Sequence, residues 1–265
     1  MTAKKSLGQN FLVDRGVAAR IVGALAPRAG EVVIEIGPGR GALTDYLVAS
    51  EARLVAVEFD RELVPRLREK YGGRDSFSVV EADALRVDYC ALIAPAGQAR
   101  LISNLPYNIS TAVVGRLIEQ RGCVPEMVLM LQREVVERIT APPSTGERGF
   151  LSVLVQTYCE VETLFDVAPG AFRPVPKVWS TVVRLRTRVS AVVFDERLFL
   201  KLLSAAFAQR RKTIANNLRA APAELKNRFE GAGGIHAMLG AANIAPERRA
   251  ETLTLEEWAA LASKV

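Results

Sequence analysis

Short apolar runs alternate with amphipathic segments along the first half of the chain, and turn residues separate them. Apolar runs of this kind are typical of buried strands, whereas apolar positions three and four residues apart are typical of helices. Because strands alternate with helices here, we expect a parallel sheet joined by right-handed crossovers. The pattern predicts strands at 32–36, 54–59, 77–82, 100–104 and 127–132, and helices at 41–49, 61–71 and 111–120.

The pattern changes in the second half of the chain. A helix is predicted at 150–160, and two strands then follow in succession at 161–167 and 178–186, with a proline-rich link between them. Two consecutive strands indicate an antiparallel pair at one edge of the sheet. From about Asp195 onward the apolar spacing is helical.

These elements predict two domains. Residues 1–190 are expected to form an α/β domain whose sheet is mostly parallel with an antiparallel edge strand, and residues 191–265 a small all-α domain. The boundary is placed within Val189–Phe194. With 265 residues, the chain is long enough for one large or two smaller domains with a buried core.

Composition excludes several classes of protein. No apolar run approaches the roughly 18 residues that span a bilayer, so neither a membrane protein nor a secreted one is expected. The three cysteines stand far apart without a CxxC pair, which argues against a disulfide framework or a thiolate metal site and favours a reducing cytoplasm. A lone histidine, His236, cannot supply a Ser-His-Asp triad or a histidine-rich metal site.

Charge is distributed unevenly along the chain. The net charge is +6, yet residues 29–172 hold 14 basic and 20 acidic side chains, so the basic excess lies in the flanks. Residues 173–188 carry five basic side chains and no acidic one, and residues 197–228 carry eight against Glu224 alone. Such stretches attract phosphates. An acidic centre between basic flanks suggests two ligands of opposite charge.

Three consecutive predicted strands end in residues suited to a nucleotide-type ligand. The first is followed by a glycine turn that includes Gly37 and Gly39, where a ligand can approach the main chain closely. Glu58 ends the second strand, 19 residues after Gly39, about where an acid accepts hydrogen bonds from ribose hydroxyls. Asp83 follows the third strand and can accept a hydrogen bond from an adenine amino group.

The fourth strand runs into Asn104-Leu105-Pro106-Tyr107, which indicates chemistry on an exocyclic amine. Such an amine is a poor nucleophile because the ring delocalises its lone pair. The Asn104 side-chain oxygen and a carbonyl of Leu105 or Pro106 can accept both amino hydrogens and direct the lone pair toward an electrophile. Pro106 fixes the backbone there, and Tyr107 can stack on the base. These four residues are the predicted catalytic group.

With these motifs, the chain resembles RNA adenine N6-methyltransferases that use S-adenosylmethionine, most closely the KsgA/RsmA-type small-subunit ribosomal RNA adenine dimethyltransferases. The resemblance covers nearly the whole chain. It includes Ser6 to Leu12, Phe172 to Ser180 and Ala206 to Leu218. It implies a Rossmann-like class I methyltransferase sheet with a helical C-terminal domain that binds RNA. This sequence departs from the family pattern at Glu81-Ala82, Ala112 and Arg148.

The resemblance also implies site residues beyond those derived above. Gln9, Asn10 and Leu12 are implied near the cofactor, together with Gly37, Gly39, Glu58, Asp83 and Asn104. Phe172 is implied as the second face of a target-base sandwich with Tyr107. The remaining substrate-binding residues are expected to be Lys177, Arg210, Arg211 and Lys212. No metal is implied.

S-adenosylmethionine also fits the charge pattern. Its carboxylate can meet backbone amides near Gly37 to Gly41, while the acidic pocket tolerates the positive sulfur. The glycine turn formally matches a dinucleotide motif, but a pyrophosphate gains less from an acidic setting, and Pro38 removes one amide. A nicotinamide oxidoreductase is therefore the weaker reading.

The expected function is methylation of adenosine N6 in small-subunit ribosomal RNA, implied to be dimethylation of two adjacent adenosines during ribosome biogenesis. The expected partner is that RNA or a precursor of the small subunit, and we expect a cytoplasmic monomer. Two further alternatives are a large-subunit ribosomal RNA methyltransferase and a noncatalytic assembly or mitochondrial transcription factor that reuses the fold.

Overall fold

The computed structural model describes residues 8–188 and 195–265. Ser6, Leu7 and the predicted boundary Val189–Phe194 lie outside the described residues. Contacts divide the chain into two units, Met1–Val136 with Cys159–Arg188 and Glu137–Tyr158 with Val189–Val265. The two units are described separately below.

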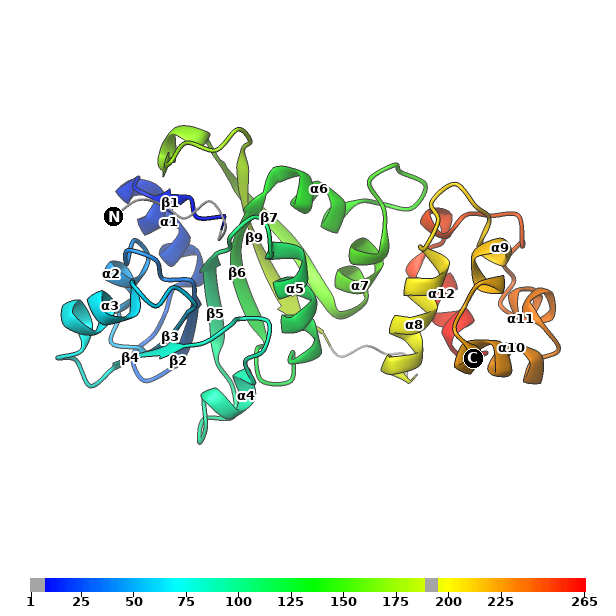
Figure 1. The fold of residues 1–265 in the computed structure, drawn as a ribbon, viewed down its shortest axis with the longest axis horizontal. Coiled ribbons are helices and arrows are strands. Elements are labelled where there is room, and N and C mark those ends of the chain that lie inside the picture. Colours follow the sequence, from blue (N-terminus) through cyan, green and yellow to red (C-terminus); the bar gives the residue numbers. More distant parts are fainter. Residues whose placement is uncertain (1–7, 189–194) are drawn as a thin grey trace. The chain divides into compact units, whose positions relative to one another are not determined.

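The first unit is built on a seven-stranded sheet of order β4-β3-β2-β5-β6-β9-β7 (Figure 1). The first five strands in this order are parallel, whereas β9 is antiparallel to both neighbours. The predicted, mostly parallel α/β sheet is thus confirmed, with β7 as the edge next to β9. Bounds are β2 Val32–Ile36, β3 Arg53–Glu58, β4 Phe77–Glu81, β5 Arg100–Asn104, β6 Glu126–Gln132, β7 Cys159–Val167 and β9 Ser180–Thr187.

Strand order reverses between β2 and β5. From β2 the chain proceeds to β3 and β4 on one side, and it then returns to add β5 and β6 on the other side. In open α/β sheets the crevice beyond the carboxyl ends of strands at such a reversal is where ligands bind. The fold therefore directs attention to the turns that follow β2 and β5.

The helices of the first unit connect these strands. They are α1 Arg15–Leu25, α2 Thr44–Leu47, α3 Val64–Tyr71, α4 Tyr89–Leu92, α5 Ser110–Glu119 and the start of α6 Arg133–Thr140. Sequence periodicity missed α1, although Asp14 Oδ1 caps it by accepting a hydrogen bond from Val17 N at 3.0 Å. Helix α1 buries Ile21 and Leu25 against the sheet. Among the described residues, no helix is long and apolar enough to cross a membrane.

A second, two-stranded sheet fixes the amino-terminal segment. Strand β1 Phe11–Leu12 pairs antiparallel with β8 Phe172–Arg173, and Leu12 lies opposite Phe172. A short 3-10 helix, Pro169–Ala171, leads into β8, and Ala171 O accepts a hydrogen bond from Val13 N at 2.8 Å. This pairing holds the first described residues against a segment more than 150 positions later in the chain.

The second unit is helical. Its helices are the end of α6, α7 Phe150–Tyr158, α8 Glu196–Ala206, α9 Ile214–Arg219, α10 Ala223–Gly231, α11 Ile235–Ala241, the 3-10 helix Ala250–Thr252 and α12 Leu255–Ala262. Trp258 is fully buried and stacks on Phe207 with ring centroids 5.6 Å apart. The predicted small all-α region is therefore observed.

The helical unit also contains a segment that sequence analysis placed in the first domain. Helix α7 is apolar on nearly all sides and packs on α8 and α12, and the Tyr158 ring meets Phe199 edge-on. The fully buried Arg148 bonds to Ala141 O and Gln156 Oε1, each at 2.8 Å. A division into folding domains near residue 190 stays a prediction.

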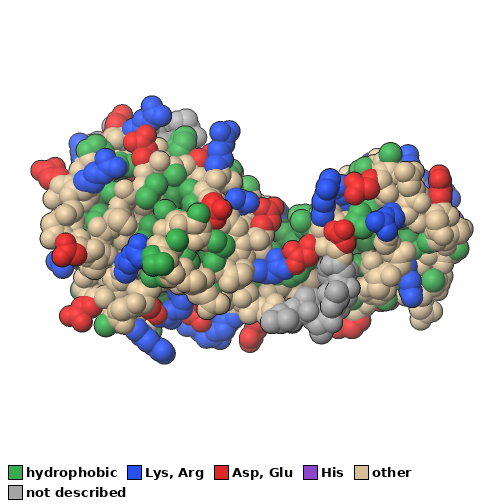
Figure 2. All heavy atoms as spheres, turned by 90° about the horizontal axis from the view of Figure 1, so that it is seen from below, with side chains coloured by type: hydrophobic (Ala, Val, Ile, Leu, Met, Phe, Trp, Pro, Cys, Tyr) green, Lys and Arg blue, Asp and Glu red, His purple; other side chains and the backbone are tan. Residues whose placement is uncertain are grey.

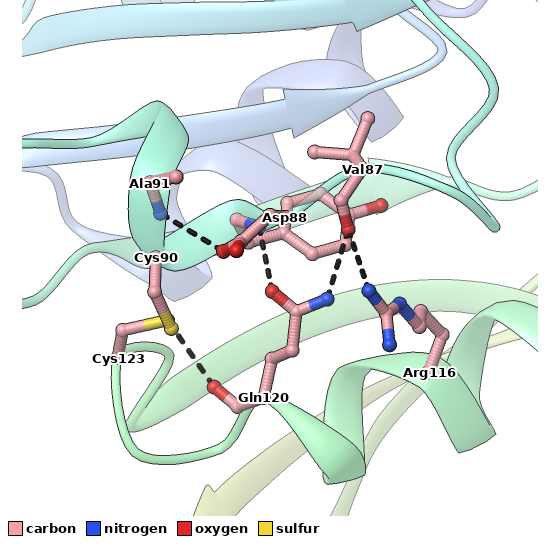
Figure 3. Close-up of a disulfide and its surroundings, with 8 residues drawn as sticks. Val87, Asp88, Cys90, Ala91, Arg116, Gln120 and Cys123 are labelled. Carbon is pink, nitrogen blue, oxygen red and sulfur yellow. Dashed lines mark hydrogen bonds between the residues drawn. A yellow bond between two sulfur atoms is a disulfide. The ribbon is translucent and has the colours of Figure 1, made fainter.

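One expectation about the cysteines is wrong. Cys90 in α4 and Cys123 after α5 form a disulfide, with their Cα atoms 5.5 Å apart, while Cys159 is free and buried (Figure 3). Their separation of 33 residues concealed this pairing, because the crossover through β5 and α5 returns the chain to α4. Gln120 joins the same segments by accepting a hydrogen bond from Tyr89 N at 2.6 Å and donating one to Val87 O at 2.9 Å.

Reducing the disulfide should lower the free energy of unfolding by about 3–4 kcal/mol, the loop-closure contribution for a bridge of this span. The measurement is urea unfolding with and without dithiothreitol. A Cys90→Ala, Cys123→Ala double variant serves as the control. Its unfolding transition should match that of the reduced wild type and should not change when dithiothreitol is added. Coincident transitions for the oxidised and reduced wild type would contradict this stabilisation.

Candidate functional site

A cavity of about 330 Å³ lies where the fold directs attention, at the carboxyl ends of β2 to β5. The turns after all four strands contribute to it, and the amino-terminal segment lines it as well. The structure thus brings together most of the residues predicted from sequence. Those lining the cavity are Gln9, Asn10, Leu12, Gly37, Gly39, Glu58, Asp83, Asn104, Leu105, Pro106 and Tyr107.

The glycine turn after β2 needs glycine at specific positions. Gly37, Gly39 and Gly41 have φ of 63°, 59° and 88°, a region that residues with a side chain rarely adopt. A Cβ on Gly41 would lie 2.1 Å from Tyr71 Oη, and one on Gly39 would lie 3.3 Å from the Phe11 ring. The backbone therefore turns tightly enough to bring main-chain atoms to the cavity wall.

The three glycine amides are bonded within the protein, and contact between backbone amides of this turn and a ligand carboxylate stays a prediction. Gly37 N donates to Val57 O at 2.9 Å and Gly41 N to Pro38 O at 2.8 Å. Gly39 N donates to Glu58 Oε2 at 3.1 Å. The sequence identified the turn, but it could not show that these three N–H groups hold the turn itself in shape.

Glu58 ends β3 as predicted and is nearly buried, with 6% of its surface exposed. Besides Gly39 N, it accepts a hydrogen bond from Asp60 N on Oε1 at 2.8 Å. Burial raises the pKa of Glu58, and the backbone donors of Asp60, Gly39 and Phe59 oppose this shift. Gln9 Nε2 donates to Asp60 Oδ2 at 2.9 Å and so ties the amino-terminal segment to the turn after β3.

Asp83 follows β4 on a loop that α4 supports. Its Oδ1 accepts a hydrogen bond from Leu85 N at 2.9 Å, which closes the turn and fixes the carboxylate at the cavity. The fully buried Tyr89 donates from its hydroxyl to Ala84 O at 2.8 Å. Both bonds hold the loop from within, so the carboxylate is presented on a rigid support.

The turn after β5 presents an amide whose orientation is set by a hydrogen bond. Asn104 Nδ2 donates to Asn10 O at 3.3 Å, so Oδ1 is the atom of this amide left to accept from a ligand. In the same turn Pro106 O accepts from Ile109 N at 3.2 Å. The side chain of Tyr107 is held by a 2.7 Å hydrogen bond between its hydroxyl and Ser180 Oγ, and burial raises the pKa of the phenol.

The amino-terminal segment lies across the glycine turn. The Arg40 guanidinium stacks on the Phe11 ring, with Cζ 4.3 Å from the ring centroid. Together with the Gln9–Asp60 bond and the Asn104–Asn10 bond, this contact fixes the segment over the cavity. The predicted covering role of Gln9 and Asn10 stays a prediction, but both side chains are where that role requires.

Other predicted residues lie away from the cavity. Phe172 is 0% exposed within the hydrophobic core and does not line the cavity, since β8 packs it beneath β1. Lys177 is exposed on the link between β8 and β9. Arg210, Arg211 and Lys212 are exposed in the second unit, between α8 and α9.

The sequence analysis missed one carboxylate. Glu35 lies inside the apolar strand β2, is 1% exposed and lines the cavity. Thr44 Oγ1 donates to its Oε2 at 2.7 Å. Burial, reinforced by the charge of Glu58, raises the pKa of Glu35 to about 8. The sequence did contain a signal for this residue, because Glu35 is the one charged residue of an otherwise apolar strand and stands two positions before the glycine turn.

Within the described ranges, no group of three or more His, Cys, Asp and Glu side chains is placed to hold a metal ion.

The first unit has a Rossmann-like methyltransferase fold. Its sheet contains the antiparallel strand β9, its strand order reverses between β2 and β5, and the turns after four strands line the cavity. The model of the family described as "Ribosomal RNA adenine dimethylase" matches residues 1–261. The chain belongs to this family of enzymes.

Relatives agree with this membership, and solved structures agree with the fold. A protein of Hahella chejuensis described as "Ribosomal RNA small subunit methyltransferase A" is 48% identical over 82% of this chain and 80% of its own length. Its counterpart in Chromohalobacter salexigens is 44% identical over 99% and 91%. The fold is similar to a dimethyladenosine transferase from Plasmodium falciparum, with a TM-score of 0.78, 24% identity and 95% of each chain covered. The 23S rRNA methyltransferase ErmE matches with a TM-score of 0.66 at 27% identity, over 96% of this chain and 99% of its own.

Glu35 should make stability depend on pH. Because its pKa rises from 4.5 to about 8 on folding, the stabilising contribution of the neutral form is complete below pH 4.5 and is lost as pH rises through 8. Relative to Glu35→Gln, the wild type should lose up to about 1.4 kcal/mol of unfolding free energy per pH unit between these values. Urea unfolding at pH 5.5, 7 and 8.5 measures the difference. Parallel pH profiles of the two proteins would contradict it.

Proposed function

We propose that this protein transfers methyl groups from S-adenosylmethionine to the N6 amine of adenosines in small-subunit ribosomal RNA, dimethylating two adjacent adenosines. The observation that carries this proposal is the oriented amide of Asn104 beside Tyr107, at the edge of a cavity lined by Glu58 and Asp83. Higher identity to small-subunit enzymes than to the large-subunit enzyme ErmE favours the small subunit as substrate.

The cavity suits S-adenosylmethionine in its polar groups. Glu58 has carboxylate lone pairs for a ribose hydroxyl beyond its three backbone donors, and Asp83 Oδ2, which lies 3.8 Å from Arg86 Nε, can accept from an adenine amino group. Acidic lining residues also favour a sulfonium over an anion. When bound, this cofactor supplies an electrophilic methyl group. Its carboxylate must find donors other than the glycine amides, which the turn itself uses.

The chain's own role is to hold the adenine amine. Asn104 Oδ1 accepts one amino hydrogen, and a backbone carbonyl accepts the second, so that the nitrogen lone pair points into the cavity. This second acceptor is the carbonyl of Leu105 or that of Pro106, which also accepts from Ile109 N and keeps a second lone pair. No dedicated base is required, since a methylated amine of this kind loses its extra proton readily to water.

Tyr107 holds the plane of the base. Its ring cannot swing freely because Ser180 Oγ fixes the hydroxyl, and so it offers a preorganised stacking face. For Phe172 to form the opposite face, β8 has to shift and expose a ring that is now fully buried. We therefore expect the target base to lie between the Tyr107 and Phe172 rings only when RNA is bound.

Replacing Asn104 should separate RNA binding from chemistry. We expect Asn104→Ala to lower kcat by about 100-fold or more, because oriented acceptors supply much of the acceleration in such reactions. Methylation of unmodified small-subunit ribosomal RNA with labelled donor, followed by mapping of the modified nucleotides, is the measurement. RNA affinity, measured by filter binding, should stay within a few-fold, whereas cofactor affinity, measured by calorimetry, should fall because the variant also loses the bond to Asn10 O, so kcat is compared at saturating donor. A variant that methylates at the parent rate would refute the assignment.

RNA binding is assigned to basic clusters. Arg210, Arg211 and Lys212 are consecutive and exposed, and Arg210 reaches Gly146 O. On the face shown in Figure 2, Lys and Arg side chains are interspersed with acidic ones. A run of three basic side chains such as this one can contact neighbouring phosphates of an RNA strand. As part of the proposal, the protein acts as a monomer on RNA or on a precursor particle; the Cys90–Cys123 disulfide removes the cysteine argument for a reducing cytoplasm.

Neutralising this cluster tests the assignment. A variant with Gln at Arg210, Arg211 and Lys212 should bind RNA at least tenfold more weakly in moderate salt and show a shallower dependence of log Kd on log salt. Cofactor affinity should not change. As a matched control, Gln at three exposed arginines of the first unit, Arg66, Arg68 and Arg74, removes the same charge. Equal salt slopes for the wild type and the cluster variant would refute a phosphate-binding role.

A further inference from the structure

An exposed tryptophan lies next to the residue that holds Tyr107. Trp179 is 45% exposed and directly precedes Ser180, whose hydroxyl bonds to the Tyr107 hydroxyl at 2.7 Å. Two further apolar side chains of the same link, Val175 and Val178, are 56% and 38% exposed. A large indole left open to water is costly unless a partner covers it. The proposed function above gives this side chain no role.

The indole is held in place by a cation on one face. The Arg133 guanidinium stacks on the ring with Cζ 4.9 Å from the centroid, and Arg133 N donates to Trp179 O at 3.0 Å. Arg133 Nη2 also bonds to Asp166 Oδ2 at 2.7 Å, and Thr181 Oγ1 donates to Asp166 Oδ1 at 2.6 Å. The ring is therefore preorganised, with an arginine behind it that is itself fixed.

The topology puts this pair on the same edge of the sheet as the catalytic turn. Arg133 follows directly after β6, and Met130 of β6 lies opposite Asn104 of β5. Trp179 directly precedes β9, whose first residue, Ser180, lies opposite Gln132, the last residue of β6. The indole thus lies beyond the carboxyl ends of β5 and β6, where the target amine is presented.

The chemistry around the ring selects a nucleic acid as its partner. The link 173–179 that carries the indole holds the exposed Arg173 and Lys177 and no acidic side chain, and Arg133 stacks on the ring, which suits a phosphate backbone. An aromatic face flanked by cations is the arrangement with which proteins stack unpaired bases of single-stranded RNA.

We propose that Trp179 stacks on an unpaired base that flanks the target adenosine in the same RNA strand, with Arg133 holding the indole in position. Stacking of a neighbouring base fixes the register of the strand while Tyr107 holds the target. Trp179 is then a determinant of substrate recognition that acts on KM for RNA. This inference rests on the proposed function.

Substituting Trp179 tests the stack kinetically. We expect Trp179→Ala to raise KM for protein-free small-subunit ribosomal RNA about tenfold, within the range of base–aromatic stacking, and to leave kcat within about twofold. Trp179→Phe should recover most of the loss because it keeps an aromatic face. Val13→Ala, at another exposed apolar residue of the same unit, is the control and should match the wild type. KM for the methyl donor should not change in any variant.

Quenching of tryptophan fluorescence by RNA tests for direct stacking, because it is not expected if Trp179 only supports the fold. The chain has two tryptophans, and Trp258 is fully buried, so quenching on addition of RNA reports Trp179. A single-stranded, adenosine-containing oligoribonucleotide should quench the wild type and leave Trp179→Phe unquenched.

The outcomes distinguish this inference from the proposed function. An unchanged KM in Trp179→Ala, or a loss seen only with protein-containing particles, would overturn the stacking proposal, and the second result would assign the indole to a protein contact. If the wild type methylates no adenosine, the proposed function fails instead, and RNA-dependent quenching still tests the stack.

Discussion

The hydrogen bond from Asn104 Nδ2 to Asn10 O is the interaction on which the site depends. An amide side chain can present either its donor or its acceptor, and this bond determines that the oxygen is left for the ligand. Asn10 can accept the bond only because β1 pairs with β8 and Gln9 is tied to Asp60. The direction of one side chain in the cavity therefore depends on pairing between segments far apart in sequence.

Much of the sheet and of the site could be predicted from sequence for a simple physical reason. Parallel strands buried on both faces are continuous apolar runs, and their carboxyl ends meet at one edge of the sheet. Residues that follow such runs, such as Glu58, Asp83 and Asn104, must therefore converge if the strands are adjacent. The cavity is lined by all three, as this reasoning requires.

What the sequence did not reveal depends on contacts between distant segments. The pairing of Cys90 with Cys123 requires the crossover through β5, and the burial of Phe172 requires the two-residue strand β1, too short to leave a periodic signal. Glu35 was overlooked because its strand reads as apolar, although the same burial gives its carboxyl an unusual pKa. Local patterns predict elements, whereas these features arise only when the elements pack.

The hydrogen bond between Tyr107 and Ser180 has a consequence for how this enzyme can be altered. The aromatic ring belongs to the turn after β5, but its outer end is anchored to β9, two strands away in the sheet. A small shift of β9 along the sheet would tilt the Tyr107 ring, although none of the residues that line the cavity would have been substituted. Substrate preference is thus open to adjustment by evolution or engineering through the outer strands, at positions that never touch the nucleotide.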